Sequence, residues 1–353
     1  MSVFDRRDVC KFPLAAAALL NAAPRKDEYA EDNTKIATMI DVRKATDDDL
    51  LFLKQIGLRW VHASFGNEPA SYECIKSAQE RLARYGLKIH CGIHDVYRSL
   101  RLQLGQPGRD QDIETFQAFL RDLGRAGVYC SKIDFHPGNT YTSKIVESSR
   151  GYKVREFNVD DFHNKVEKQR FERGYSAEDI WANYAYFINA VLPVAEKANV
   201  RLALHPDDPP IPMMNGVAKV FTHYNGIKRA DEIARGSKYW GLTFCVGTWS
   251  EGGDKMGKDV FGMIEDFGAR GKIFAVHFRN VSSPLPRFNE ALPDDGYLDM
   301  YKVMVALRKA RCTASLIPDH YPSLVGDTNR RIAEAYSIAY MRALLHRANE
   351  EAG

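Results

Sequence analysis

Several features of specialised proteins are missing from this chain of 353 residues. Its six cysteines form no C-x-x-C motif or other close pair, so we predict buried thiols and no disulfide framework. No apolar run approaches the ~18 residues of a membrane-spanning helix. The 49 basic and 46 acidic residues nearly balance, with a net charge of +3. We therefore expect neither nucleic acid nor a membrane as a partner.

The N-terminal segment differs from the rest of the chain. Arg6 and Arg7 precede a short Ala/Leu run in DRRDVCKFPLAAAALLNAAP, which resembles a twin-arginine export signal. An amphipathic first helix is the alternative. We predict a leader over residues 1–30, a periplasmic location with a cytoplasmic one as the alternative, and one catalytic domain over residues 31–353.

Short β-rich runs alternate with helical stretches through the remaining sequence. The eight runs cover residues 34–40, 59–64, 88–94, 129–135, 201–205, 241–247, 273–280 and 314–319. They are almost continuously apolar, as is typical of parallel strands covered on both faces. Helical patterns such as IETFQAFLRDLGRAG and MYKVMVALRKAR lie between them. This alternation predicts an α/β fold, a (β/α)₈ TIM barrel. An open doubly wound sheet would require a G-x-G-x-x-G turn after an early strand, and the sequence has none.

Two long insertions interrupt the alternation. The first, residues 136–176, follows the fourth strand, and the second, SSPLPRFNEALPDDGYLD, follows the seventh. A segment of such length in a compact domain is usually a lid or a binding insertion, or else mobile. Both insertions leave the C-terminal ends of strands, the face on which barrels of this kind build active sites.

Side chains that can bind metal end four successive strands. Each of these residue types, taken alone, is more often a buried core residue. In a barrel, however, the ends of successive strands converge at one mouth, so the coincidence predicts a metal site. Two imidazoles, a thiolate and a carboxylate suit zinc, iron, cobalt or manganese, and a catalytic site keeps positions open for substrate oxygens. The four predicted ligands are His205, Cys245, His277 and Asp319.

The same mouth supplies candidates for proton transfer. His320 follows Asp319, and histidine ordinarily titrates near neutrality, so we predict that His320 is the general acid or base. Tyr321 is a second candidate acid. Asp207, in HPDDPP, is a third catalytic candidate that could orient a ligand group, the alternative being a surface turn.

Four further residues are candidates for substrate binding. Arg279 and Asn280 follow the seventh strand and could clamp a carboxylate, because a guanidinium fork matches carboxylate geometry. This favours a sugar acid over a neutral sugar. Asp208 and His94 also stand after strand ends. Ordinary ion pairs and loop contacts are the alternative for all four.

Several of these motifs occur together in one known family. LALHPDDPP, GLTFCVG, VHFRNV, FNEALPDDGYLDM and PDH, in this order, resemble the mannonate dehydratase family of xylose-isomerase-like barrels. The resemblance runs from about Gly105 to the helix AYSIAYMRALL. It implies Mn²⁺ as cofactor, with another divalent metal as the alternative. The residues that correspond to the family's metal ligands and catalytic histidine are His205, Cys245, His277, Asp319 and His320.

The resemblance implies a carbon–oxygen lyase that converts D-mannonate to 2-keto-3-deoxy-D-gluconate and water. Three family features are absent: the arginine before PDH, where Ile317 and Pro318 stand, the histidine after F-x-E, and the tyrosine-bearing loop after PDH. A metal-dependent isomerase, epimerase or lyase for another sugar acid or a keto-sugar is therefore the alternative. A non-catalytic sugar-binding protein is a further one. The expected partner is a small sugar acid, and self-association into a homo-oligomer stays open.

Overall fold

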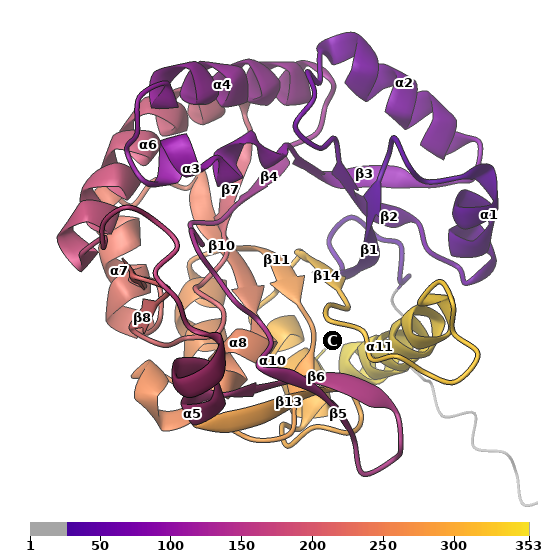
Figure 1. Ribbon diagram of the computed structural model, residues 1–353. Coiled ribbons are helices and arrows are strands. Elements are labelled where there is room, and N and C mark those ends of the chain that lie inside the picture. Colours follow the sequence, from indigo (N-terminus) through magenta and orange to yellow (C-terminus); the bar gives the residue numbers. More distant parts are fainter. Residues whose placement is uncertain (1–26, 353) are drawn as a thin grey trace, which may run out of the picture.

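Eight parallel strands close into a barrel in the computed structural model, which describes residues 27–352. The strands follow one another around the barrel in the order β1-β14-β11-β10-β7-β4-β3-β2, with the helices outside them (Figure 1). The predicted TIM barrel is confirmed. The barrel strands are β1 (Lys35–Asp41), β2 (Trp60–Ser64), β3 (Lys88–Ile93), β4 (Cys130–Ile133), β7 (Arg201–Leu204), β10 (Trp240–Cys245), β11 (Ile273–His277) and β14 (Ser315–Ile317).

Helices separate the strands as the sequence pattern predicts, and several begin at strong caps. Ser176 starts α6 with a capping box, because its hydroxyl accepts from the Asp179 amide while the Asp179 carboxylate accepts from the Ser176 amide. The same helix ends at Asn199 in the left-handed conformation. The helices are α1 (Asp47–Gln55), α2 (Tyr72–Ala83), α3 (Leu100–Gln103), α4 (Arg109–Arg125), α5 (Val159–Asp161), α6 (Ala177–Ala198), α7 (Tyr224–Ile233), α8 (Val246–Gly252), α9 (Val260–Met263), α10 (Met300–Lys309) and α11 (Arg331–Ala352).

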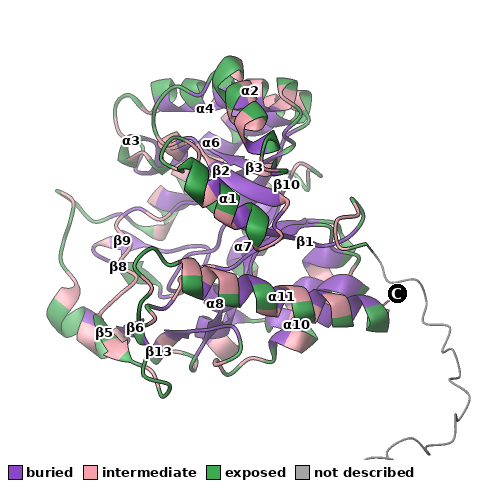
Figure 2. Cartoon of the chain, turned by 90° about the vertical axis from the view of Figure 1, so that its right-hand side faces the viewer, coloured by how far each residue is buried: buried purple, intermediate pink, exposed green. Residues whose placement is uncertain are grey.

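The outer helices pack closely on the barrel and on one another. A Cβ at Gly124 would stand 2.2 Å from the Ala198 carbonyl oxygen, so glycine lets α4 lie directly against α6. On β3, Gly92 likewise leaves room for the Leu123 side chain of α4. Buried positions form one large apolar core between strands and helices (Figure 2). This rigid frame fixes the strand ends that carry the candidate site.

The two insertions fold together, which the sequence did not predict. The first contributes β5 (Lys144–Glu147) and β6 (Lys153–Asn158), the second contributes β13 (Arg287–Ala291), and β12 (Asn280–Val281) directly precedes the second. They form one four-stranded antiparallel sheet in the order β12-β13-β6-β5, which we call the rim sheet. It projects from the barrel at one side of the molecule (Figure 2).

An apolar cluster fixes the rim sheet. Phe288 of β13 pairs with Phe157 of β6, and their rings lie 5.9 Å apart between centroids. Phe162, Ile211 and Met214 are buried in the same cluster. The first insertion is therefore packed against the second through this cluster.

The termini and cysteines bear on the remaining predictions. The twin-arginine pattern lies outside the described residues, whereas Tyr29, within the predicted leader, donates from its hydroxyl to the Gly57 carbonyl at 2.9 Å. All five cysteines of the described part are free thiols, as predicted, and four of them are buried, whereas Cys74 is exposed; Cys10 lies outside this part. Among the described residues, no helix combines the length and apolar character needed to cross a membrane.

Candidate active site

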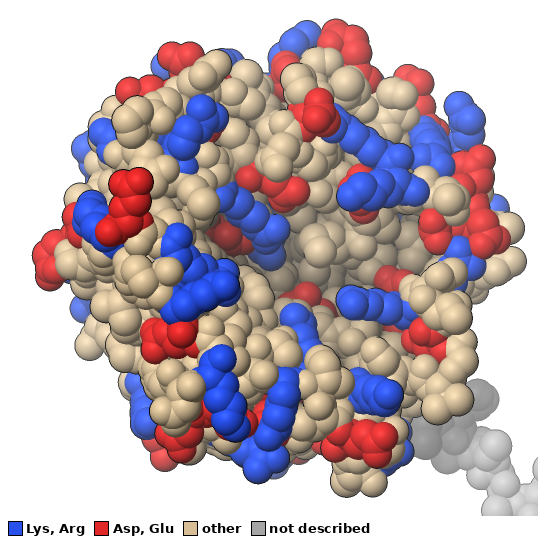
Figure 3. All heavy atoms as spheres, in the orientation of Figure 1, with Lys and Arg blue, Asp and Glu red and all other residues tan. Residues whose placement is uncertain are grey.

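A cavity of about 350 Å³ opens at the C-terminal ends of the barrel strands. The hollow is visible at the centre of the face in Figure 3, with acidic and basic side chains around it. Its wall includes His205, His277, Asp319 and His320 from the barrel, and Tyr141 and Arg155 from the first insertion. A larger cavity, of about 670 Å³, lies at the opposite strand ends and contains none of the predicted ligands. The smaller cavity is therefore the candidate site.

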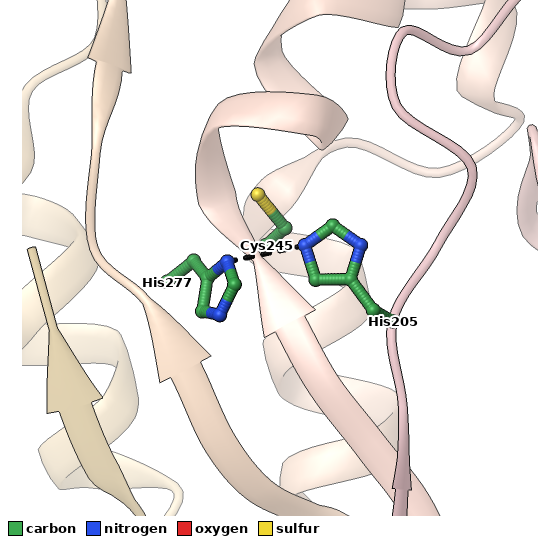
Figure 4. A group of neighbouring side chains, drawn as sticks. All are labelled: His205, Cys245 and His277. Carbon is green, nitrogen blue, oxygen red and sulfur yellow. Dashed lines mark hydrogen bonds between the residues drawn. The ribbon is translucent and has the colours of Figure 1, made fainter. Parts of the chain in front are cut away.

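Three of the four predicted metal ligands form one group beside this cavity, and the fourth, Asp319, contacts that group. Ligand atoms of His205, Cys245 and His277 all lie within 4.8 Å of one another, and the three side chains are buried (Figure 4). His205 Nε2 stands 3.1 Å from His277 Nδ1. Asp319 Oδ2 lies 3.0 Å from the same His277 nitrogen. The structure thus groups the nitrogen and sulfur donors of three adjacent strand ends, with the Asp319 carboxylate in contact with one of them.

Neighbouring groups prepare these donors for a cation. His205 Nδ1 donates to the Pro206 carbonyl at 2.7 Å, which leaves the Nε2 lone pair facing the group. Cys245 Sγ accepts from the Thr248 amide at 3.4 Å. Burial raises the pKa of the Cys245 thiol to about 12, so a thiolate here requires a compensating cation. Two imidazoles, a thiol and a carboxylate with these orientations fit a divalent metal ion.

His320 lies beside the donor group and is held by a carboxylate. Its Nδ1 stands 2.5 Å from Glu290 Oε1, and its Nε2 stands 3.4 Å from Asp319 Oδ2. The His320 backbone has a φ of +53°, in the left-handed region that side chains rarely adopt. Backbone strain of this kind is common at functional sites. A histidine oriented by a carboxylate can accept or donate a proton at its other nitrogen.

Arg279, predicted to clamp a substrate carboxylate, is instead surrounded by the protein's own carboxylates. Its Nη2 lies 2.7 Å from both Asp208 and Glu251, and its Nη1 lies 3.0 Å from Glu290. A Cβ at Gly247 would stand 2.4 Å from the guanidinium carbon, so this glycine makes room for the network. Arg279 is buried, contacts Glu290 and Asp208 through its two terminal nitrogens, and does not line the cavity. Asp208 does line it.

Two further substrate-binding candidates, Asn280 and His94, make contacts within the protein and not with the cavity. Asn280 donates to the carbonyls of Pro293 and Leu298 and accepts from the Leu298 amide, which fastens the second insertion. His94 accepts from the Val96 amide and is buried with its ring tilted against Phe119. Neither residue lines the cavity, because strand-end position alone does not decide which way a side chain points.

Two of the catalytic candidates are also placed elsewhere. The Asp207 carboxylate accepts from the amides of Val220 and Phe221 and is fully buried below the loop. The Tyr321 hydroxyl lies 3.3 Å from Glu334, in the first turn of α11. Neither lines the cavity, so neither is in a position to transfer a proton there. In both cases a partner from a distant part of the chain decides the position.

The structure adds three residues that the sequence reasoning missed. Tyr141 and Arg155 line the cavity from the first insertion, whose fold the sequence did not predict. Lys132 lines it from the barrel wall on β4. The available signal for Lys132 was a lysine in the middle of an otherwise apolar strand, YCSKIDF.

Comparison with known proteins decides the family. The family model for D-mannonate dehydratase (UxuA) matches residues 154–351, more than half of the chain. The chain belongs to the mannonate dehydratase family. As a member of this family it is a carbon–oxygen lyase of the hydro-lyase class, as the sequence predicted.

Individual members of the mannonate dehydratase family resemble the chain over most of its length. A mannonate dehydratase of Streptococcus suis is 29% identical over 269 residues, covering 69% of this chain and 71% of its own. Mannonate dehydratase 2 of Halalkalibacterium halodurans is 27% identical, covering 73% and 81%. The crystal structure of mannonate dehydratase from Streptococcus suis serotype 2 superposes with a TM-score of 0.80 and 26% identity, over 91% of this chain and 96% of that one. A structure of L-ribulose 3-epimerase, at 14% identity and a TM-score of 0.57, shares the fold.

The position where the mannonate dehydratase family usually has arginine lies within the barrel in this chain. Ile317 is buried there in a small apolar cluster with Ala37 and Trp60. That position cannot supply a charge to a substrate. Positive charge in the cavity must therefore come from other residues.

Proposed function

We propose that the protein is a metal-dependent dehydratase that converts D-mannonate to 2-keto-3-deoxy-D-gluconate and water. The observation that carries this proposal is one cavity lined by His205, His277 and Asp319, with Cys245 beside them, and by a histidine oriented by a carboxylate. Membership of the mannonate dehydratase family supports the reaction type. The predicted cofactor is Mn²⁺, held by His205, Cys245, His277 and Asp319.

The reaction removes a proton from C2, next to the carboxylate, and a hydroxyl group from C3. The C2–H bonding electrons form the C2=C3 double bond, and the C3–O bonding electrons leave with the hydroxyl group. The resulting enol becomes the 2-keto product as C3 gains a proton and the C2 hydroxyl loses one. A divalent cation, when bound, supplies Lewis-acid stabilisation of the negative charge that develops on the sugar-acid oxygens.

His320 is suited to take the C2 proton. Because Glu290 accepts from the Nδ1–H of His320, the Nε2 lone pair is left as the base. The charge that then develops on the imidazolium is stabilised by Glu290. Arg279 holds Glu290 in turn, at 3.0 Å.

Tyr141 is suited to protonate the departing hydroxyl group. Its ring lies 6.1 Å from that of His320 between centroids, at the same cavity. Burial raises the pKa of the Tyr141 hydroxyl, so it remains protonated and able to donate. Its hydroxyl stands 3.3 Å from His136 Nδ1, which orients it. In this proposal Tyr141 has the role that the sequence suggested for Tyr321.

The test is a turnover assay on D-mannonate with metal-stripped protein, with and without Mn²⁺, following 2-keto-3-deoxygluconate. We expect product only with metal, and a loss of about 10²–10⁴-fold in kcat in His320→Ala. The control is Arg98→Lys, which changes another residue of the cavity wall but keeps a cation beside Asp134. It shows whether any disturbance of the cavity lowers kcat as His320→Ala does. Folded, metal-loaded protein that forms no product would overturn the proposal. Incorporation of solvent deuterium at C2 without loss of water would then indicate an isomerase or epimerase.

A further inference from the structure

The carboxylates that line the cavity are all paired with cations of the protein. Asp134 lies 2.9 Å from Arg98, and Asp208 lies 2.7 Å from Arg279. Asp319 belongs to the donor group with His277. Anionic groups of the wall therefore have partners before any ligand enters.

Lys132 is a cation of the same wall without such a partner. It is 7% exposed on β4 and forms no hydrogen bond or ion pair with any described residue. Burial, reinforced by nearby Arg98, lowers its pKa, although the negative charges of Asp134 and Asp319 act in the opposite direction. A poorly solvated ammonium group without a partner is unfavourable, and Lys132 faces a cavity in which a ligand could pair with it.

Arg155, on the rim sheet, is a second cation of the cavity wall without an ion-pair partner. It lies on β6 of the rim sheet, is half-buried and lines the cavity. Its flanking residues, Val154 and Glu156, are fully buried, as expected for the alternate face of a strand. Within residues 27–352 its guanidinium has no hydrogen bond or ion pair.

The charges of the proposed metal do not account for these two cations. A divalent ion brings two positive charges, which the Asp319 carboxylate and a Cys245 thiolate would offset. Lys132 and Arg155 therefore remain available to contact a ligand, and a guanidinium fork matches a carboxylate in two-point geometry.

We propose that Lys132 and Arg155 together bind the carboxylate of the sugar acid and make the cavity select acids over neutral sugars. This rests on the proposed function, and it names the residues that supply the positive charge that neither the buried Ile317 position nor the carboxylate-bound Arg279 supplies. Lys132 approaches from the barrel and Arg155 from the rim sheet. Binding thereby joins the two parts of the site.

The first experiment measures equilibrium binding of D-mannonate and of its neutral counterpart D-mannitol to metal-stripped protein, in which no turnover occurs. We expect Lys132→Met and Arg155→Gln each to weaken D-mannonate binding about tenfold or more, with D-mannitol unchanged. Lys153→Gln is the matched control: it removes a positive charge from the same strand at an exposed position outside the cavity wall, and should leave both affinities unchanged.

The second measurement separates ligand binding from a structural role. Lys132→Met should not lower the Tm, because it removes an unpaired buried charge. Lys219→Met is the contrast: Lys219 is equally buried but donates to the Pro137 carbonyl at 3.0 Å, so its loss should lower the Tm and leave D-mannonate affinity unchanged. A lower Tm in Lys132→Met with unchanged D-mannonate affinity overturns the inference.

The outcomes distinguish this inference from the proposed function. If the wild type binds D-mannonate tightly but forms no keto-deoxy product, and both variants lose that binding, the inference holds and the reaction is different. If the wild type turns D-mannonate over and both variants keep its KM, the reaction stands and the inference fails. Wild-type protein that binds D-mannitol as tightly as D-mannonate also overturns it.

Discussion

His320 Nδ1 lies 2.5 Å from Glu290 Oε1, across the boundary between the last barrel strand and the rim sheet. The base of the proposed reaction is therefore oriented by a residue of the second insertion. The hydrogen bond to Glu290 fixes both the tautomer and the ring orientation of His320, whereas burial alone would fix neither.

Glu290→Gln should lower kcat about 10–100-fold and leave KM little changed, because His320 keeps its place but loses its fixed tautomer. Steady-state kinetics measure the effect, and ¹⁵N chemical shifts of His320 report the tautomer. Glu147→Gln, at an exposed position of the same sheet, is the control and should match the wild type. Equal kcat in the two variants would contradict the role of Glu290.

Tyr141→Phe should lower kcat about 10²-fold or more, since it removes the proposed acid without changing the ring. Tyr321→Phe should leave kcat within a few fold and reduce stability slightly, because the Tyr321 hydroxyl contacts Thr38 and Glu334 away from the cavity. Parallel assays at saturating D-mannonate, with a melting curve for each variant, compare the two. The reverse order of effects would return the acid role to Tyr321.

Cys245→Ser should reduce bound metal sharply, measured as metal per chain by elemental analysis after dialysis against a chelator. A serine hydroxyl is a weaker ligand for a borderline-soft cation than a thiolate. Cys312→Ser changes an equally buried thiol that lies outside the donor group, and metal content should then stay at the wild-type value. Unchanged metal content in Cys245→Ser would remove the thiolate from the site.

Asp49→Asn should lower the free energy of unfolding by about 1 kcal/mol at pH 7. Asp49 pairs with Arg331 at 2.6 Å and caps α1 through the Thr46 amide, and these bonds lower its pKa from an ordinary 3.8 to about 2. A lowered pKa gives stabilisation that is complete above about pH 4 and is lost as the pH falls through about 2.

Urea unfolding of wild type and Asp49→Asn at pH 7 and pH 3 tests this dependence: the difference between them should be smaller at pH 3. Asp48→Asn is the control, since Asp48 also pairs with Arg331, at 2.7 Å, but lies outside the capping box. A difference that stays constant with pH would mean that the Asp49 charge contributes nothing.

The barrel and the donor group could be predicted because they depend on local pattern. Each apolar run became a strand, and convergence of strand ends is a property of the fold that brings His205, Cys245 and His277 together without further information. The direction of a side chain after a strand end depends on distant partners. Arg279 turned toward three carboxylates, and Tyr321 toward Glu334, because of contacts that no periodicity encodes.

The rim sheet could not be predicted for a related reason. Its β6 and β13 come from insertions that three barrel strands separate in the sequence, and their pairing includes a contact between Phe157 and Phe288. The positions of Tyr141 and Arg155 depend on that pairing. The residues that the sequence analysis missed are thus those that a long-range β contact places.

The shared rim sheet also constrains how substrate range can change in this lineage and in engineered variants. A new length or register in one insertion would leave the hydrogen-bonding edge of the other without its partner. The two insertions are therefore expected to be inherited, exchanged or grafted as a pair. A transplant of residues 136–176 alone into another barrel would carry Arg155 but not the strand that holds it in place.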